Sequence, residues 1–247
     1  MLSVHTLEVR PTVDALNESV GEAFFARLRM LIDEAEAPAR INLALSGGAV
    51  TTSLLPSLLP RVGEVDWSRV RVWMVDERYV PAGDEDRNDD QALEGFFHAA
   101  TGVEFMRMPT SDSWAPGGGS LDEACAAFAA TWADVMGKRS FDIALIGMGP
   151  DGHICSLFPG RIDADEASPI LAIRNSPKPP PERITVSMTV MQACPEVWLT
   201  TTGAAKASAL GAAFAGASPL DLPVAGVLSP TTRVYLDEAA ASQIALP

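Results

Sequence analysis

The sequence feature that most constrains the fold is a short apolar run, residues 141–146, which ends abruptly in a loop rich in glycine, proline and aspartate. A run of this length and content is typical of a strand buried on both faces of a parallel sheet. The loop, residues 147–160, places Asp151 and His153 on one turn. Because ligands in open α/β sheets bind beyond the carboxyl ends of the strands, we expect the chemistry of this protein at this loop.

Strand-like and helix-like segments alternate along the chain on both sides of this loop. Further predicted strands occupy residues 4–9, 41–45, 70–75, 103–108, 184–188, 197–203 and 234–237. Helices are predicted over residues 15–36, 53–59, 89–99 and 121–136, from Gly203 onward, and at the end of the chain. Because the alternation continues without a break in composition, we expect one doubly wound α/β domain over residues 1–247. Its sheet is expected to be mostly parallel, with helices on both faces.

Three segments show neither pattern. Residues 159–182 are expected to be irregular, since their proline cluster excludes a helix. Residues 111–120, which contain three consecutive glycines, predict a flexible surface loop. Residues 222–229 predict a loop with some strand character.

The acidic composition restricts the possible partners. The chain has 32 acidic and 18 basic residues, a formal net charge of -14 at pH 7, which disfavours non-specific binding to nucleic acid. The protein as a whole would also repel a phosphorylated substrate. Any anion site is therefore expected to be a local group of arginine, lysine and backbone N–H donors.

Cysteine usage and hydropathy predict the compartment. Cys125, Cys155 and Cys194 are widely spaced and are expected to be buried, reduced thiols of a cytosolic protein. The first residues lack the pattern of a signal peptide. No apolar run reaches the ~18 residues that a membrane-spanning helix needs. We therefore expect a soluble cytoplasmic protein with no membrane partner.

Polar residues follow four of the predicted strands at the point where each strand ends. They are Ser46-Gly47-Gly48, Asp76-Glu77-Arg78, Asp151-Gly152-His153 and the stretch from Gly203 to Lys206. In a parallel sheet these ends converge on one edge. Together they supply cations and N–H donors for a phosphate, and a histidine that can act as a general base near neutral pH.

Each strand end also has a plainer interpretation. The two glycines after Ser46 are compatible with a structural turn, and Arg78 with an ion pair to Glu77 or to the acidic residues 84–86. Lys206 at a helix start is unfavourable for the helix dipole unless an anion binds there, although a solvated lysine is the commoner case. His153 is compatible with a structural role.

Several reaction classes lack their sequence signature. The chain has no Gly-x-Gly-x-x-Gly dinucleotide motif, no nucleotide triphosphate loop and no Gly-x-Ser-x-Gly nucleophile elbow. No residues have the spacing of a zinc or calcium site. Hydrolysis by a histidine-activated water therefore fits better than covalent or metal-assisted catalysis.

The run Asp-Gly-His-x-x-Ser-Leu-Phe-Pro within residues 147–160 resembles the signature loop of the 6-phosphogluconolactonases. The resemblance extends in order through residues 43–48, 76–81, 176–185 and 203–210, and so covers nearly the whole chain. It implies the α/β fold of the sugar-phosphate isomerases and deaminases, a modified Rossmann fold. The implied activity is hydrolysis of 6-phospho-D-glucono-1,5-lactone in the oxidative pentose phosphate pathway, without a cofactor.

With this resemblance, the site residues take definite expected roles. His153, neutral at pH 7, takes a proton from the water that attacks the lactone carbonyl, and Asp151 orients the loop or the imidazole. Arg78 stabilises the oxyanion or holds a sugar hydroxyl. The expected substrate-binding residues are Ser46, Gly47, Gly48, Asp76, Arg183 and Lys206, and all of these except Asp76 are expected to hold the phosphate.

The chain departs from the family pattern at two places. After the two glycines the family usually has Ser-Thr-Pro, whereas this chain has Ala49-Val50-Thr51 and so lacks one hydroxyl. Backbone N–H groups can serve instead, and Thr51 or Thr52 is a candidate replacement. The family commonly has Ser-Asn where this chain has Arg87-Asn88, so Arg87 is either a further cation near the site or part of a loop.

Two other functions remain open. Amino-sugar-phosphate deaminases share the Asp-Gly-His turn but continue with Asn-Glu-Pro, whereas residues 156–159 supply no carboxylate here. A non-catalytic sugar-phosphate sensor on the same fold usually carries a helix-turn-helix segment, and this chain starts with a predicted strand. In all three cases the partner is a small sugar phosphate. We expect a monomer, because no exposed apolar helix stripe is evident.

Overall fold

The computed structural model describes residues 4, 6–113, 119–161 and 168–245. The strands are β1 (Thr6–Arg10), β2 (Ile41–Leu45), β3 (Val70–Met74), β4 (Asp76–Arg78), β5 (Glu104–Met106), β6 (Ile143–Ile146), β7 (Ile170–Ile173), β8 (Arg183–Val186), β9 (Val197–Thr201) and β10 (Arg233–Asp237). The α-helices are α1 (Val13–Glu34), α2 (Leu55–Leu58), α3 (Asn88–Gly95), α4 (Leu121–Met136), α5 (Met188–Gln192), α6 (Ala207–Phe214) and α7 (Glu238–Ala241).

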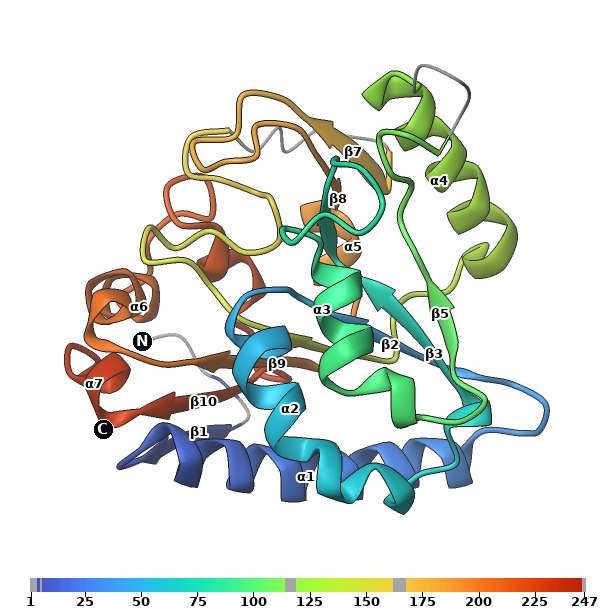
Figure 1. Ribbon diagram of the computed structural model, residues 1–247. Helices are drawn as coiled ribbons and strands as arrows, with labels where there is room; N and C mark the ends of the chain where they lie inside the picture. Colours follow the sequence, from blue (N-terminus) through green and yellow to red (C-terminus); the bar gives the residue numbers. More distant parts are fainter. Residues whose placement is uncertain (1–3, 5, 114–118, 162–167, 246–247) are drawn as a thin grey trace.

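Within the described residues, seven strands form one sheet in the order β1-β10-β9-β6-β2-β3-β5, and every neighbouring pair is parallel (Figure 1). From β2 the chain moves outward through β3 to β5. It then restarts at β6, beside β2, and moves the other way through β9 to β10. The order therefore reverses between β2 and β6, which makes this pair the switch point of the sheet. The predicted doubly wound, mostly parallel α/β fold is confirmed.

Successive residues of the central strands point to opposite faces of this sheet. Leu43 and Leu45 of β2 pack in an apolar cluster with α1, α2 and α3, whereas Ala44 between them packs in a second cluster that contains α4. In the second cluster Trp73 of β3 contacts Trp132 of α4, with ring centroids 5.2 Å apart. Helices thus cover both faces, as the sequence pattern predicts.

A second, small sheet corrects part of the sequence analysis. Strands β4, β8 and β7 pair antiparallel, with β8 in the middle. Residues 184–188, predicted as a strand, contribute β8 to this sheet and not to the parallel one. The expectation that residues 159–182 are irregular is wrong for Ile170–Ile173, which form β7. A strand of four residues offers too few positions for an alternating pattern to be recognised.

Two local differences also concern segments near strand ends, and one predicted loop lies partly outside the described residues. The helix after β2 begins at residue 50, before the predicted start at residue 53, with a π-helical turn (Val50–Leu54). Residues 222–229 contain a 3-10 helix (Pro223–Val227) and not the expected strand character. Of the predicted surface loop at 111–120, residues 114–118 lie outside the described residues.

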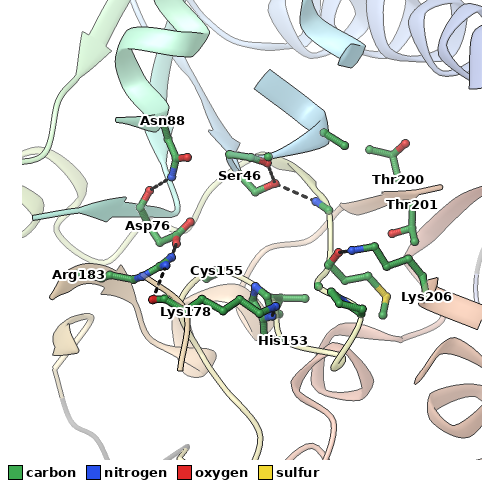
Figure 2. Close-up of a pocket in the computed structure, with 18 of the residues that line it drawn as sticks. Ser46, Asp76, Asn88, His153, Cys155, Lys178, Arg183, Thr200, Thr201 and Lys206 are labelled. Carbon is green, nitrogen blue, oxygen red and sulfur yellow. Dashed lines mark hydrogen bonds and ion pairs between the residues drawn. The ribbon is translucent and has the colours of Figure 1, made fainter. Parts of the chain in front are cut away.

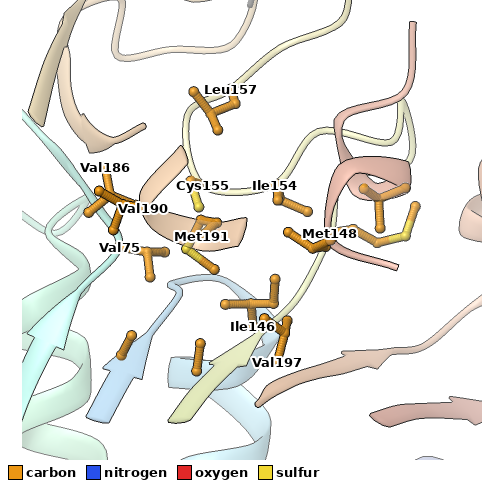
Figure 3. Packing of buried hydrophobic residues seen from close by; sticks show 14 of the residues in the cluster. Val75, Ile146, Met148, Ile154, Cys155, Leu157, Val186, Val190, Met191 and Val197 are labelled. Carbon is orange, nitrogen blue, oxygen red and sulfur yellow. The ribbon is translucent and has the colours of Figure 1, made fainter. Parts of the chain in front are cut away.

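The loop after β6 is anchored by apolar packing on the core. Figure 3 shows Ile154 and Leu157 of this loop in the same cluster as Ile146, Val75 and Met191. Ile154 and Leu157 are 1% and 3% exposed. Because these two residues follow His153 in sequence, their burial fixes the backbone on one side of the histidine.

Two other expectations concern the whole chain. All three cysteines are buried, as expected. In the part of the chain that the structure describes, no helix has the length and apolarity required to cross a membrane.

Candidate active site

The loops that follow β2 and β6 meet at the switch point of the sheet. The Ser46 hydroxyl accepts a hydrogen bond of 2.9 Å from the backbone N–H of Gly147. The first residue after β2 is therefore bonded to the first residue after β6. Ligands of doubly wound folds bind outside the carboxyl ends of the strands at such a point. The fold therefore places the two candidate loops where a ligand is expected.

A cavity of about 360 Å³ opens at this point (Figure 2). Eight of the nine predicted site residues line it: Ser46, Gly47, Gly48, Asp76, Arg78, His153, Arg183 and Lys206. Further lining residues are Ala49, Asn88, Gly147, Met148, Gly149, Pro150, Ile154, Cys155, Lys178, Pro179, Thr200, Thr201 and Thr202. Asp151 is the ninth, and it is linked to the cavity through its contacts with His153 and Lys178. Within the described residues, no cluster of three or more His, Cys, Asp or Glu is placed to hold a metal ion.

His153 and Asp151 form a hydrogen-bonded pair. The His153 Nδ1 atom lies 2.5 Å from Asp151 Oδ1. Burial lowers the pKa of His153, although the Asp151 carboxylate acts in the opposite direction. Burial would raise the pKa of Asp151, but hydrogen bonds from His153 and Lys178 outweigh it and lower that pKa. An ionised carboxylate only accepts hydrogen bonds, so the neutral imidazole carries its hydrogen on Nδ1 and keeps its lone pair on Nε2.

The imidazole is packed between the backbone and an aromatic ring. A Cβ atom at Gly149 would lie 2.0 Å from His153 Cε1, so only glycine leaves room for the imidazole at this position. Phe158 packs against the imidazole with ring centroids 4.8 Å apart. The glycine before the Asp-Gly-His turn and the phenylalanine after it therefore fix the orientation of the histidine.

Lys178 is a site residue that the sequence analysis did not identify. Its Nζ atom lies 3.1 Å from Asp151 Oδ1 and 3.2 Å from His153 Nδ1. The lysine comes from the proline-rich segment, 25 residues after the histidine. Its position between prolines was the available signal, since a stiff segment holds a cation in place.

Arg183 is held firmly by its surroundings. Its Nη2 donates to the carbonyls of Lys178 (3.1 Å) and Pro179 (3.0 Å), and its Nε donates to that of Pro180 (3.2 Å). The arginine is only 4% exposed, and burial lowers its pKa. Figure 2 shows Arg183 and Lys206 on opposite sides of the cavity, with His153 between them.

Asp76 links the small sheet to the loop after β6. Its Oδ2 accepts a hydrogen bond of 2.6 Å from the Ser156 hydroxyl and lies 3.9 Å from Arg183 Nη1. The serine of the Ser-Leu-Phe run therefore binds a cavity-lining carboxylate. The backbone carbonyl of Asp76 accepts a bond of 3.1 Å from Asn88 Nδ2.

Arg78 also lines the cavity, but it makes neither of the ion pairs considered in the sequence analysis. Its Nη1 donates to the backbone carbonyl of Asp86, and its Nε is buried without a hydrogen-bond partner. Its backbone N–H donates to the buried carboxylate of Glu77 at 2.8 Å. The guanidinium therefore keeps a donor that no side chain or backbone group in the described structure occupies.

Asn88 and the threonines at the carboxyl end of β9, residues 200–202, are further lining residues that sequence reasoning missed. A Cβ at Gly47 would lie 1.9 Å from Asn88 Oδ1, so the amide of Asn88 covers the glycine turn closely. The Oδ1 of Asn88 and the Oγ1 of Thr201 are buried and have no hydrogen-bond partner in the described structure. For the threonines, the signal was their place at the end of a predicted strand.

The two departures from the family pattern have clear structural outcomes. Ala49 lines the cavity, whereas Thr51 is buried away from it and donates to Gln91 Oε1 at 3.0 Å. Thr52 donates to the carbonyl of Gly48 and does not line the cavity either, so neither threonine replaces the missing hydroxyl there. Arg87 is fully buried in an ion pair with Asp89 at 2.7 Å and is not a further cation of the site.

Lys206 lies in a 3-10 turn (Ala204–Lys206) that precedes α6. Its Nζ donates a hydrogen bond of 2.9 Å to the backbone carbonyl of Met148, so the lysine points into the cavity and not into solvent. Burial lowers its pKa, and the charge of Lys178 acts in the same direction. Bound to a neutral carbonyl, the ammonium keeps its charge available for an anion.

The chain matches known proteins over nearly its whole length. A family model described as glucosamine-6-phosphate isomerases/6-phosphogluconolactonase matches residues 11–236. A 6-phosphogluconolactonase of Mycobacterium leprae is 40% identical over 83% of this chain and 85% of that protein. One of Streptomyces coelicolor is 35% identical over 92% and 91%. The solved structure of a 6-phosphogluconolactonase from Trypanosoma cruzi matches with a TM-score of 0.82 and 20% identity, over 100% of this chain and 99% of that one. The chain belongs to the family of glucosamine-6-phosphate isomerases and 6-phosphogluconolactonases.

Proposed function

We propose that this protein hydrolyses 6-phospho-D-glucono-1,5-lactone to 6-phospho-D-gluconate, the lactonase step of the oxidative pentose phosphate pathway. The observation that carries the proposal is the His153–Asp151 pair at a cavity that also contains Arg78 and Lys206. The names of the relatives support the same reaction, since the proteins from Mycobacterium leprae and Streptomyces coelicolor are both called 6-phosphogluconolactonase.

In the proposed mechanism His153 is the general base. Its Nε2 takes a proton from a water molecule as the water oxygen attacks the lactone carbonyl carbon. The tetrahedral intermediate then breaks the bond between that carbon and the ring oxygen, and the proton on Nε2 passes to the ring oxygen. Asp151 holds the hydrogen on Nδ1 throughout, which keeps Nε2 free to accept and return the proton.

Arg78 is proposed to stabilise the oxyanion that develops on the carbonyl oxygen. Its side chain lines the cavity, and donors aimed at a developing charge contribute roughly 3 kcal/mol each to transition-state stabilisation. Asp76, held by Ser156, is proposed to accept a hydrogen bond from a sugar hydroxyl. Both groups act from the side of the cavity that the small sheet provides.

The phosphate is proposed to bind between Lys206 and the turn formed by Ser46, Gly47 and Gly48. The N–H groups of the first turn of a helix lack partners within that helix and attract anions, and such a helix begins at Val50. Figure 2 shows Arg183 on the opposite side of the cavity from Lys206. The expectation that Arg183 also holds the phosphate stays a prediction.

A direct assay distinguishes this function from the other two. Freshly prepared lactone is added to the enzyme, and product formation is measured with the spontaneous hydrolysis subtracted. Ammonia release from glucosamine 6-phosphate is measured in parallel. We expect lactone hydrolysis without ammonia release, because residues 154–160 contain no acidic residue that could assist ring opening. Ammonia release would favour a deaminase, and sugar-phosphate binding without turnover would favour a sensor.

The proposal also includes the wider setting of the enzyme. We propose that residues 1–247 act as one catalytic domain and as a monomer in the cytoplasm. Light scattering after size-exclusion chromatography tests the monomer, for which a mass near the 26.1 kDa of the chain is expected.

A further inference from the structure

The ammonium of Lys178 and the imidazole of His153 share one carboxylate oxygen. Asp151 Oδ1 lies 2.5 Å from His153 Nδ1 and 3.1 Å from Lys178 Nζ, and the two nitrogens are 3.2 Å apart. Since the imidazole donates its Nδ1 hydrogen to the carboxylate, the ammonium approaches that N–H as a second donor. The two groups therefore repel each other, and the repulsion grows when the imidazole becomes positively charged.

The position of Lys178 is fixed through its backbone. Arg183 donates to the carbonyls of Lys178 and of the next two residues, and the N–H of Lys178 donates to Ser176 Oγ at 3.3 Å. These bonds hold the lysine in place whatever its side chain does. Its side chain is 39% exposed, whereas that of His153 is 16% exposed.

We propose that Lys178 is a positioning residue that acts through His153: it shares the Asp151 carboxylate with the imidazole and opposes protonation of Nε2. Without the ammonium, only burial would oppose the stabilisation of the imidazolium by Asp151, and the histidine would retain its proton to a higher pH. The charge of Lys178 thus offsets that of Asp151, while Asp151 still sets the position of the hydrogen. The inference rests on the proposed role of His153 as the base, but its first test needs no substrate.

The charged groups that act on His153 come from three parts of the chain. Asp151 lies in the same loop, Lys178 in the proline-rich segment and Asp76 in β4. The two carboxylates favour the imidazolium, whereas Lys178 and burial disfavour it. Among these groups Lys178 is the cation, and its charge opposes those of the two carboxylates.

The test is an NMR titration of the histidine side chains in the absence of substrate. The chain contains three histidines, so the signal of His153 is identified as the one missing from His153→Asn. In Lys178→Met we expect the titration midpoint of His153 to move to higher pH, and in Asp151→Asn to lower pH. Lys178→Arg, which keeps the charge, should leave it close to that of the unmodified protein.

Lys138→Met is the matched control, because it removes one positive charge from an exposed lysine. An unchanged midpoint in Lys178→Met, or an equal shift in Lys138→Met, would overturn the proposal. If Lys178→Met does not fold, Lys178→Gln replaces it in the same titration.

In the lactonase assay, the acidic limb of the kcat/KM profile should move to higher pH in Lys178→Met. A loss of activity equal at every pH would instead mean that Lys178 acts on the substrate. Absence of lactonase activity would contradict the proposed function and leave the titration result standing.

Discussion

The hydroxyl of Ser46 accepts a hydrogen bond of 2.9 Å from the backbone N–H of Gly147, 101 residues further along the chain. Ser46 directly follows β2 and Gly147 directly follows β6, so this bond joins the two strands between which the sheet reverses its order. The proposed phosphate turn and the loop that contains His153 are thereby held in a fixed relation.

Replacing Ser46 by alanine should weaken this connection. The substitution removes this half-buried hydrogen bond, and a typical protein hydrogen bond contributes about 0.5–1.5 kcal/mol to stability. We expect a loss of this size in the free energy of unfolding measured with urea, together with a lower kcat/KM. Ser208→Ala is the control, since Ser208 is exposed on α6 and should be nearly neutral. Equal stabilities of the two variants would show that the bond contributes nothing.

Replacing His153 by asparagine should remove the general base. General base catalysis contributes roughly 10²–10⁴-fold, so kcat should fall by a factor in this range. Binding of 6-phosphogluconate, measured by calorimetry, should change little because the imidazole is not proposed to hold the phosphate. His98→Asn, at an exposed position, serves as the control. Near-normal turnover in His153→Asn would exclude the histidine as the base.

The activity should depend on pH through the protonation of His153. Burial lowers the pKa of this histidine below its usual 6.5, and the base works only when it is neutral. We therefore expect kcat/KM to be constant around pH 7 and to fall only as the pH drops through the lowered pKa. A decline that begins above pH 7 would mean that a different group controls the reaction.

Stability should depend on pH through Glu77, the buried residue between Asp76 and Arg78. Burial, together with the charge of Asp89, raises the pKa of Glu77 from its usual 4.5 to about 8. The folded state therefore binds a proton more tightly than the unfolded state, so this contribution to stability is complete below pH 4.5 and is lost as the pH rises through about 8. In Glu77→Gln the free energy of unfolding should fall less between pH 5 and 8 than in the unmodified protein. Parallel stability profiles would contradict this.

Replacing Gly149 by alanine should displace the imidazole. The added Cβ would lie 2.0 Å from His153 Cε1, so the imidazole must move. Misplacing a catalytic group by about 1 Å can cost about 10²-fold in rate, and we expect a loss of this order in kcat. Gly63→Ala is the control, because a Cβ there meets nothing within 4 Å. Activity of Gly149→Ala equal to that of the control would show that the site tolerates a shifted imidazole.

Local sequence patterns were sufficient for much of the fold and of the candidate site. Apolar runs and helical spacing predicted the strands of the parallel sheet, because burial on both faces imposes a continuous apolar sequence. The polar residues at strand ends could be recognised because each apolar run stops where the strand leaves the core. Ser46 and Asp76 directly follow such runs, His153 and Lys206 lie in the segments after two others, and all four line one cavity.

What only the tertiary structure decided depends on contacts between distant segments. Lys178 lies beside His153 because Arg183 binds the carbonyls of the proline-rich segment, and Asn88 covers Gly47 because α3 packs near the turn after β2. Arg87, by contrast, is a buried partner of Asp89. Residue types and spacing cannot specify such contacts, since the same arginine or lysine is equally compatible with solvent, an ion pair or a ligand. The packing of the whole chain decides among these, because it determines which charges lose water and which partners replace it.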